Sequence, residues 1–93
     1  MAKTKTLEKH IEKACGSIAR GKGWLFWKLT VMGFPGVPDR LLLGAGARVK
    51  FVEFKLPGGK PTALQEAWHR KLRSLGFEVY VIDNVEDFEK IIG

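Results

Sequence analysis

The sequence predicts an α/β protein in which a mixed central β-sheet is flanked by helices. Segments of helical and of strand periodicity follow one another in the order α-β-β-β-α-β-α. Apolar side chains occur at both parities in segment 49–55, which is typical of a strand that is covered on both faces. A helical segment over residues 62–75 then leads into a strand over residues 77–82, and such a crossover favours parallel pairing.

The first two elements are a helix and an aromatic strand. We predict the helix over residues 6–19, with Thr6 as its N-cap. The apolar positions that share one face of this helix are Leu7, Ile11, Ala14 and Ile18. Glycines at positions 21 and 23 end the helix, and the apolar, Trp-containing segment 24–29 is predicted as a strand.

Turn-forming residues delimit the remaining elements. Gly and Pro exclude regular structure from residues 30–38. A hairpin is then predicted from a strand over residues 40–43, a Gly-rich turn at residues 44–46 and the strand over residues 49–55. The predicted N-caps of the two later helices are Thr62 and either Asp83 or Asn84.

Composition excludes several classes of protein. The chain has 93 residues, which predicts one domain over residues 1–93, and its apolar content of 45% excludes disorder. Cys15 is the single cysteine, and its spacing from His10 and His69 fits no zinc site, so we assign all three residues to structural or surface roles. Because no apolar run approaches the roughly 20 residues that span a bilayer and no signal peptide is evident, we expect an intracellular, soluble protein of a host cell cytoplasm, without a membrane partner.

The charge indicates the kind of partner. Sixteen Lys and Arg residues stand against ten Asp and Glu, which gives a net charge of +6 and an isoelectric point near 9.7. Such an excess favours binding to polyanions such as nucleic acids. Alternatively, the charge only keeps the protein soluble.

Glu53 and Lys55 are the most unusual residues of the predicted sheet. Both lie near the end of a strand that otherwise has the composition of a central strand, and their i, i+2 spacing places both side chains on one face. Charged residues are seldom buried without a partner. The two residues therefore form either a chemical site or an ordinary surface ion pair, which would contribute about 0–1 kcal/mol.

Asp39 favours the chemical site. It follows Pro38 at the start of the preceding strand, and the hairpin brings it near the end of the strand that carries Glu53. Two carboxylates and a lysine form a hard oxygen site suited to Mg²⁺ or Mn²⁺, which can lower the pKa of bound water and neutralise a scissile phosphate. Alternatively, Asp39 only forms a turn after proline.

These residues resemble a known family. Gly36-Val-Pro-Asp-Arg40, followed by Phe51-Val-Glu-Phe-Lys55, resembles the Pro-Asp…Glu-x-Lys motif of the PD-(D/E)XK nuclease superfamily. Within it, the sequence is most similar to the VRR-NUC (virus-type replication-repair nuclease) domain in its stand-alone minimal form, which is often virus-encoded. A Pro-Gly-Gly-Lys loop after the motif, Gln65, and the strand that starts at Gly76 are similar as well. The resemblance spans about residues 7–91 and implies a restriction-endonuclease-like core.

The resemblance implies roles for the site residues. Asp39 and Glu53 would bind the metal ion together with the backbone carbonyl of Phe54. Lys55 would be the catalytic lysine. Gln65 would point toward the same centre and orient water or the lysine. Alternatively, because a threonine precedes Gln65 by three residues, Gln65 only completes a capping box.

The family also places a glutamate of the first helix near the metal ion. Glu8 and Glu12 are both candidates, since their i, i+4 spacing places them on one face. Glu8 is favoured, because it precedes Ile11 by three residues as in the Glu-x-x-aliphatic start of related junction-cutting nucleases. Lys28 matches a lysine of similar sequences and would hold phosphate at the edge of the site, or it is a snorkelling strand residue. The residues predicted to contact DNA phosphates are Lys22, Lys28, Arg40, Lys60 and Arg70.

The predicted function is a structure-specific endodeoxyribonuclease that uses Mg²⁺ or Mn²⁺ to hydrolyse phosphodiester bonds in branched DNA such as four-way (Holliday) junctions. Resolvases of this form act as two-fold dimers, and a homodimer is expected here. The aromatic residues that would form either its contact or the core are Trp24, Trp27, Phe34 and Trp68. The alternatives are a non-catalytic, basic nucleic-acid-binding module of the same fold and a small structural protein whose charge is incidental.

Overall fold

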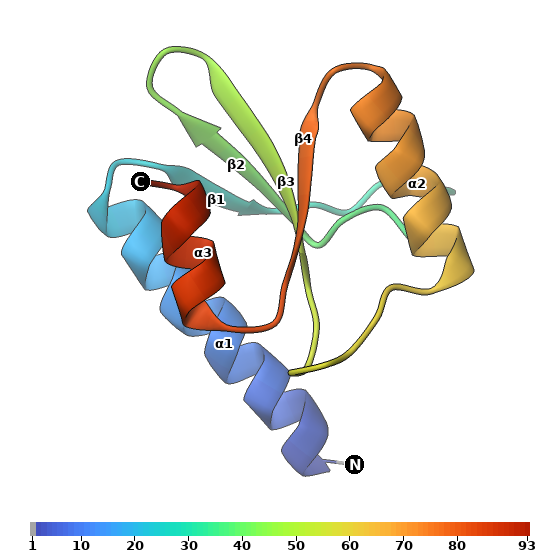
Figure 1. Ribbon diagram of the computed structural model, residues 1–93, viewed down its shortest axis with the longest axis horizontal. Helices are drawn as coiled ribbons and strands as arrows, with labels where there is room; N and C mark the ends of the chain where they lie inside the picture. The colour runs from blue at the N-terminus through green and yellow to red at the C-terminus, as the bar shows by residue number, and fades with distance from the viewer. Residues whose placement is uncertain (1) are drawn as a thin grey trace.

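The elements follow one another in the predicted order. The computed structural model describes the backbone of residues 2–93 and the side chains of residues 7–93. Its helices and strands are α1 (Ala2–Gly21), β1 (Leu25–Lys28), β2 (Arg40–Gly44), β3 (Arg48–Phe54), α2 (Ala63–Ser74), β4 (Glu78–Ile82) and α3 (Val85–Ile91). The α/β class and the order α-β-β-β-α-β-α are thereby confirmed (Figure 1). Within residues 2–93, no helix combines the length and the apolar character that crossing a bilayer requires.

The sheet is mixed, with the strand order β1-β2-β3-β4. β1, β2 and β3 pair antiparallel, and β4 joins β3 in parallel, as the crossover through α2 predicted. α1 and α3 lie together on one side of the sheet and α2 lies on the other (Figure 1). β3 is therefore an inner strand covered on both faces, and its neighbouring residues Val52 and Glu53 are both buried.

The main core lies between the sheet and the α1–α3 layer. Its buried residues are Cys15, Ala19, Trp24, Phe26, Leu42, Val52, Phe54, Ile82, Phe88 and Ile92. The rings of Phe26, Phe54 and Phe88 pack against one another with centroids 6.1–6.2 Å apart. Of these rings, Phe88 belongs to α3, so the aromatic contacts pack α3 against the sheet.

The first helix differs from the prediction in its start and in its buried face. It begins at Ala2, so Thr6 lies inside the helix and is not its N-cap; the side chain of Thr6 is outside the described range. Two residues of the predicted apolar face are exposed, Leu7 and Ala14. Cys15 and Ala19 are instead fully buried. Their small side chains let α1 approach the sheet closely, which the spacing of larger apolar residues did not indicate.

Cys15 and His10 have the structural and surface roles assigned to them. His10 is exposed. Burial raises the pKa of the Cys15 thiol to about 11, and the negative charges of Glu89 and Glu12 act in the same direction. The thiol is therefore protonated and unreactive at neutral pH.

The β2–β3 hairpin turns one residue later than predicted. β2 includes Gly44, and the turn residues Gly46 and Ala47 have φ angles of 76° and 61°. Gly44 stays in the strand because the Trp24 ring lies against it, and a Cβ at Gly44 would meet that ring at 2.6 Å. Trp24 is only 3% exposed. It is therefore a core residue and is not available for the dimer contact for which it was considered.

Both later helices begin at side-chain caps. Thr62 caps α2, as predicted, and forms a reciprocal capping box with Gln65. Asn84 caps α3 by accepting a hydrogen bond of 2.8 Å from the backbone N–H of Asp87. Of the two predicted alternatives for this cap, Asn84 is thus the correct one.

Candidate active site

Two carboxylates from neighbouring strands meet on the α2 side of the sheet. Arg40 pairs with Val52 across the β2–β3 hairpin. Asp39 precedes Arg40 and Glu53 follows Val52, so this register places the two acids opposite each other, on the same face. The backbone N–H of Phe54 donates a hydrogen bond of 2.8 Å to Oδ2 of Asp39. The hairpin register therefore both aligns the two carboxylates and anchors one of them.

Glu53 is an acid in a setting that disfavours its charge. It is 1% exposed. Burial raises the pKa of Glu53 to about 8, and the charge of Asp39 and a hydrogen bond to that carboxyl contribute to the increase. The Lys55 ammonium opposes this shift, and the charge of Glu8 reinforces it. The raised pKa means that Glu53 favours its protonated form near neutral pH, as a buried acid beside a second carboxylate does.

Lys55 leaves the sheet at the same strand end. Its backbone N–H donates to the carbonyl of Ile82 at 2.9 Å and extends the parallel ladder by one residue. The chain then turns sharply, and the N–H of Gly59 donates to the carbonyl of Leu56 at 2.7 Å. The Lys55 ammonium is held close enough to lower the pKa of Glu53. The strand end thus carries two acids and one compensating base.

Gln65 completes the capping box and also points toward the carboxylates, where its contact is with Glu53 and not with the lysine named in the prediction. Its Oε1 accepts a hydrogen bond of 2.9 Å from the backbone N–H of Thr62, which completes the α2 capping box. Its Nε2 donates to Oε2 of Glu53 at 3.1 Å. A side-chain amide has a separate acceptor and donor, so one residue can cap the helix and orient the carboxylate.

His69 is a neighbour of the carboxylates that the sequence analysis did not place there. It is 2% exposed, and its Nε2 lies 3.5 Å from Oε1 of Glu53. Neither of these atoms has a hydrogen-bond partner among the described residues. Burial and the Arg73 charge lower the pKa of His69, so its neutral form is favoured. The signal that could have located it is its i+4 spacing from Gln65, which places both residues on one face of α2.

The two candidate acids of α1 have different surroundings. Glu8 is near enough to Glu53 to raise its pKa. Glu12 accepts a hydrogen bond of 2.6 Å from Nε of Arg40 and is the partner of that residue in an ion pair. Glu8 is therefore the α1 acid whose charge is felt at the carboxylate pair.

The basic residues predicted to contact DNA do not form one group. Lys28 pairs with Arg40 in the β1–β2 register, and both line a cavity beside α1. Lys60 is exposed in the loop that follows Lys55. Arg70 lines a separate cavity of about 260 Å³ beside His69. Lys22 follows the opposite end of α1, about 21 Å along the helix from Glu8.

The donor atoms at the strand end suit a hard divalent cation. Among the residues that the structure describes, no three His, Cys, Asp or Glu side chains are grouped as a metal site. Asp39 and Glu53 supply two carboxylates, and the backbone N–H of Phe54 holds the first of them in place. Oε1 of Glu53 is buried without a hydrogen-bond partner within the described part of the chain. Oxygen donors of this kind, with water in the remaining positions, suit a hard divalent cation.

Known proteins are similar to this chain in sequence and in fold. No family model matches the chain. It is 40% identical over 85 residues to "Putative nuclease p44" of Acyrthosiphon pisum secondary endosymbiont phage 1. The aligned region covers 91% of this chain and 90% of that protein. A solved structure described as a VRR_NUC domain is similar with a TM-score of 0.87 and 29% sequence identity, over 92% of this chain and 94% of that one. The chain belongs to the VRR-NUC family.

VRR-NUC membership confirms the resemblance inferred from the Pro-Asp…Glu-x-Lys motif and the restriction-endonuclease-like arrangement expected from it. In this VRR-NUC chain, the motif residues Asp39 and Glu53 lie opposite each other at one end of the β2–β3 hairpin, and Lys55 follows directly. The similarity covers nearly the whole chain, so it includes α1 and α2 as well as the motif strands.

Proposed function

We propose that this VRR-NUC protein is a metal-dependent endonuclease that hydrolyses phosphodiester bonds in branched DNA, including four-way junctions. The observation that carries the proposal is the pairing of Asp39 with Glu53 at the strand end from which Lys55 emerges. The similarity to a phage protein named as a nuclease and to a VRR_NUC domain supports the same activity. The net charge of +6 favours association with DNA.

Each residue of the centre has a distinct task in this proposal. Asp39, Glu53 and the carbonyl of Phe54 would hold Mg²⁺ or Mn²⁺. Such an ion, when bound, supplies charge neutralisation at the scissile phosphate and a water of lowered pKa. The Lys55 ammonium stabilises the negative charge that develops on the phosphate oxygens. Gln65 fixes one oxygen of Glu53, at 3.1 Å, and leaves the other free to act as a ligand.

Glu53 must be ionised to serve as a ligand. Its pKa of about 8 means that it holds a proton at neutral pH when no cation competes for the site. Cation affinity should therefore increase with pH until Glu53 is fully ionised. Glu8 would contribute a further negative charge from α1.

An apolar surface supports a homodimer as the active form. Trp27 and Phe34 are 52% and 51% exposed. The rings of Phe34 and Trp68 pack edge to face, 5.7 Å apart, beside an apolar hollow of about 330 Å³. Exposed apolar surface of this kind is typical of interfaces.

A four-way junction presents its scissile strands in pairs, which a two-fold dimer matches. Light scattering is expected to give the mass of two chains, and Phe34→Ser is expected to give the mass of one.

Cleavage of a synthetic four-way junction tests the activity. The unmodified protein should cut the junction in Mg²⁺ or Mn²⁺ faster than a linear duplex or a flap of the same sequence, and it should not cut in EDTA. Lys55→Ala and Asp39→Asn should abolish cutting, whereas Lys71→Ala, on the exposed side of α2, should not. If the Lys55 and Asp39 variants cut as fast as the unmodified protein, the assignment is overturned. Binding of junctions without cation uptake would instead identify a non-catalytic binding module.

A further inference from the structure

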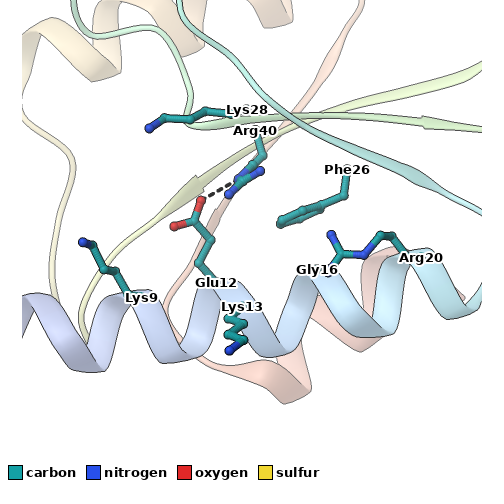
Figure 2. A pocket seen from close by; sticks show the side chains of 8 residues that line it. All are labelled: Lys9, Glu12, Lys13, Gly16, Arg20, Phe26, Lys28 and Arg40. Atoms are coloured by element: carbon teal, nitrogen blue, oxygen red, sulfur yellow. Dashed lines mark hydrogen bonds and ion pairs between the residues drawn. The ribbon is translucent and has the colours of Figure 1, made fainter.

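A concave surface lies on the side of the sheet opposite the carboxylates. It is a cavity of about 380 Å³ between α1 and the β1–β2 pair (Figure 2), which we call the α1 groove. The basic residues that line it are Lys9, Lys13, Arg20, Lys28 and Arg40. Its one acidic lining residue, Glu12, is already paired with Arg40 at 2.6 Å. The groove is therefore strongly positive, which favours an anionic ligand.

The floor of the groove is an aromatic ring that orients two guanidinium groups. Arg40 and Arg20 lie over the Phe26 ring, 4.6 Å and 5.9 Å from its centroid, and Figure 2 shows them on opposite sides of it. Gly16 makes this arrangement possible, because a Cβ at that position would meet the Phe26 ring at 2.9 Å. A glycine inside a helix costs roughly 0.5–1 kcal/mol relative to alanine. The close approach of Phe26 to α1 explains why glycine occupies this position.

The donors of the groove suit phosphate. Arg40 lines the cavity, and its hydrogen bond to Glu12 uses Nε, so the four N–H groups on its terminal nitrogens are not used in that bond. Lys9 and Lys28 extend from facing elements, as Figure 2 shows. A guanidinium with defined orientation together with mobile ammonium groups is the donor set that binds phosphate oxygens.

The length of the groove indicates a polymer and not a single phosphate. Lys9 and Arg20 both line the groove and are eleven positions apart on α1. The helix rises about 16 Å over that distance. Charges spread over this distance match a chain of phosphates better than one compact anion.

The groove lies on the opposite face of the sheet from the candidate active site, and residues that are adjacent in sequence connect the two regions at two places. Lys9 follows Glu8 on α1, and Arg40 follows Asp39 on β2. Consecutive strand residues point to opposite faces, so Asp39 faces the carboxylate site and Arg40 faces the groove. A DNA strand cut beside Asp39 can therefore continue along α1.

We propose that the α1 groove binds the sugar–phosphate backbone of the DNA strand adjacent to the cleaved bond. This inference rests on the proposed function for its DNA ligand, and it adds Lys9, Lys13 and Arg20 to the binding surface. Phosphate contacts of this kind position DNA without reading its sequence. The groove should therefore contribute equally to DNA molecules of different sequence.

The salt dependence of DNA binding tests the proposal. The double variant Lys9→Gln/Lys13→Gln removes two exposed charges and leaves the Phe26 contacts in place. Its affinity for a fluorescein-labelled four-way junction is measured in EDTA by fluorescence anisotropy, from 50 to 200 mM salt. The slope of log affinity against log salt should become shallower by about 2 relative to the unmodified protein. The decrease in affinity between those salt concentrations should therefore be roughly tenfold smaller.

The matched control is Lys71→Gln/Lys90→Gln, which removes the same charge from α2 and α3. It should leave the slope unchanged. A slope for the groove variant equal to that of the unmodified protein would overturn the proposal, and so would an equal change in the control, which would indicate net charge alone. Because binding is measured without a cation, this outcome is independent of cleavage. An unmodified protein that binds but never cuts would contradict the proposed function and leave the groove assignment to be decided by the slopes.

Discussion

The two faces of the sheet carry opposite chemistry at the same strand end. On the α2 face, the acids Asp39 and Glu53 are brought together, and Glu53 is 1% exposed. On the α1 face, basic side chains surround an open cavity and an aromatic ring. Enclosure makes the first region sensitive to single protons, whereas the second region is hydrated and its charges are screened by salt. Substitutions on the α2 face should therefore change the cleavage rate and the stability strongly. Substitutions on the α1 face should change these quantities less, and their effects should add.

The largest difference between the faces should come from Glu53→Gln. This change keeps the shape of the side chain and removes the carboxylate ligand on the α2 face. Junction cleavage in Mg²⁺ should decrease by about 10³-fold or more, which corresponds to several kcal/mol of lost transition-state stabilisation. Single-turnover cleavage at saturating protein measures it. Glu12→Gln, on the α1 face, is the control and should lose far less; a comparable loss would remove the distinction between the faces.

The next effect concerns stability and pH without divalent cations. The pKa of Glu53 is about 8 in the folded protein, well above the 4.5 of an unburied glutamate, so the folded state holds a proton that the unfolded chain releases. The stability from this group is complete below the unfolded value and is lost as pH rises through about 8. The total for this group is on the order of 5 kcal/mol at most.

Urea unfolding in EDTA at pH 6.5 and pH 8.5 measures this effect. The unmodified protein should lose stability over that range, and Glu53→Gln should lose much less, because glutamine has no proton to release. The lowered pKa of His69 acts in the opposite direction. The stability that the protein gains from neutral His69 is lost as the pH falls below the pKa of histidine in the unfolded chain. The chosen pH range largely avoids that contribution. Parallel pH dependence in the two proteins would contradict the assignment of the proton to Glu53.

Gln65 and Thr62 allow the two roles of the α2 cap to be separated. Gln65→Ala removes the bond that Gln65 Oε1 accepts in the capping box and the hydrogen bond to Glu53, whereas Thr62→Ala removes only the capping bond that Thr62 Oγ1 accepts. Each variant should lose about 1 kcal/mol of stability. Only Gln65→Ala should weaken Mg²⁺ affinity or cleavage, by about 10- to 100-fold, as loss of a group that orients a metal ligand typically does. Identical kinetics in both variants would limit Gln65 to capping.

The smallest effect is expected at Gly16 on the α1 face. Gly16→Ala improves helix propensity but places a Cβ 2.9 Å from the buried Phe26 ring, so a net loss of about 1–2 kcal/mol is expected. Gly21→Ala is the control, since nothing lies within 4 Å of its Cβ position. Thermal unfolding compares them. A Gly16→Ala protein as stable as Gly21→Ala would show that the Phe26 contact adapts freely.

Chain order, parallel pairing and the placement of Asp39 near Glu53 could be predicted because they depend on local rules. Strand alternation, the crossover and hairpin geometry are all visible in the sequence. The position of His69 beside Glu53 could not be predicted in the same way, because it depends on how α2 is rotated against the sheet. The metal and DNA roles of these residues stay predictions that the experiments above address.

The buried face of α1 was predicted correctly at Ile11 and Ile18, which pack against the core, but its other residues and the turn at Gly44 were predicted wrongly for a related reason. Cys15 and Ala19 are buried because close helix–sheet packing favours small side chains, whereas periodicity arguments give weight to large ones. Gly44 has the composition of a turn, but it belongs to β2 because Trp24, twenty residues earlier, lies against it. Both errors arise where a contact distant in sequence determines the local structure.

Oε1 of Glu53 has no hydrogen-bond partner among the described side chains, and this affects how the protein would take up a cation. Because the carboxyl is still protonated at pH 7, uptake of an ion there must expel close to one hydrogen ion into the buffer. The heat of titration would then depend on the buffer's own enthalpy of ionisation, even though the buffer never touches the protein. Calorimetry in phosphate and in Tris would count that hydrogen ion directly.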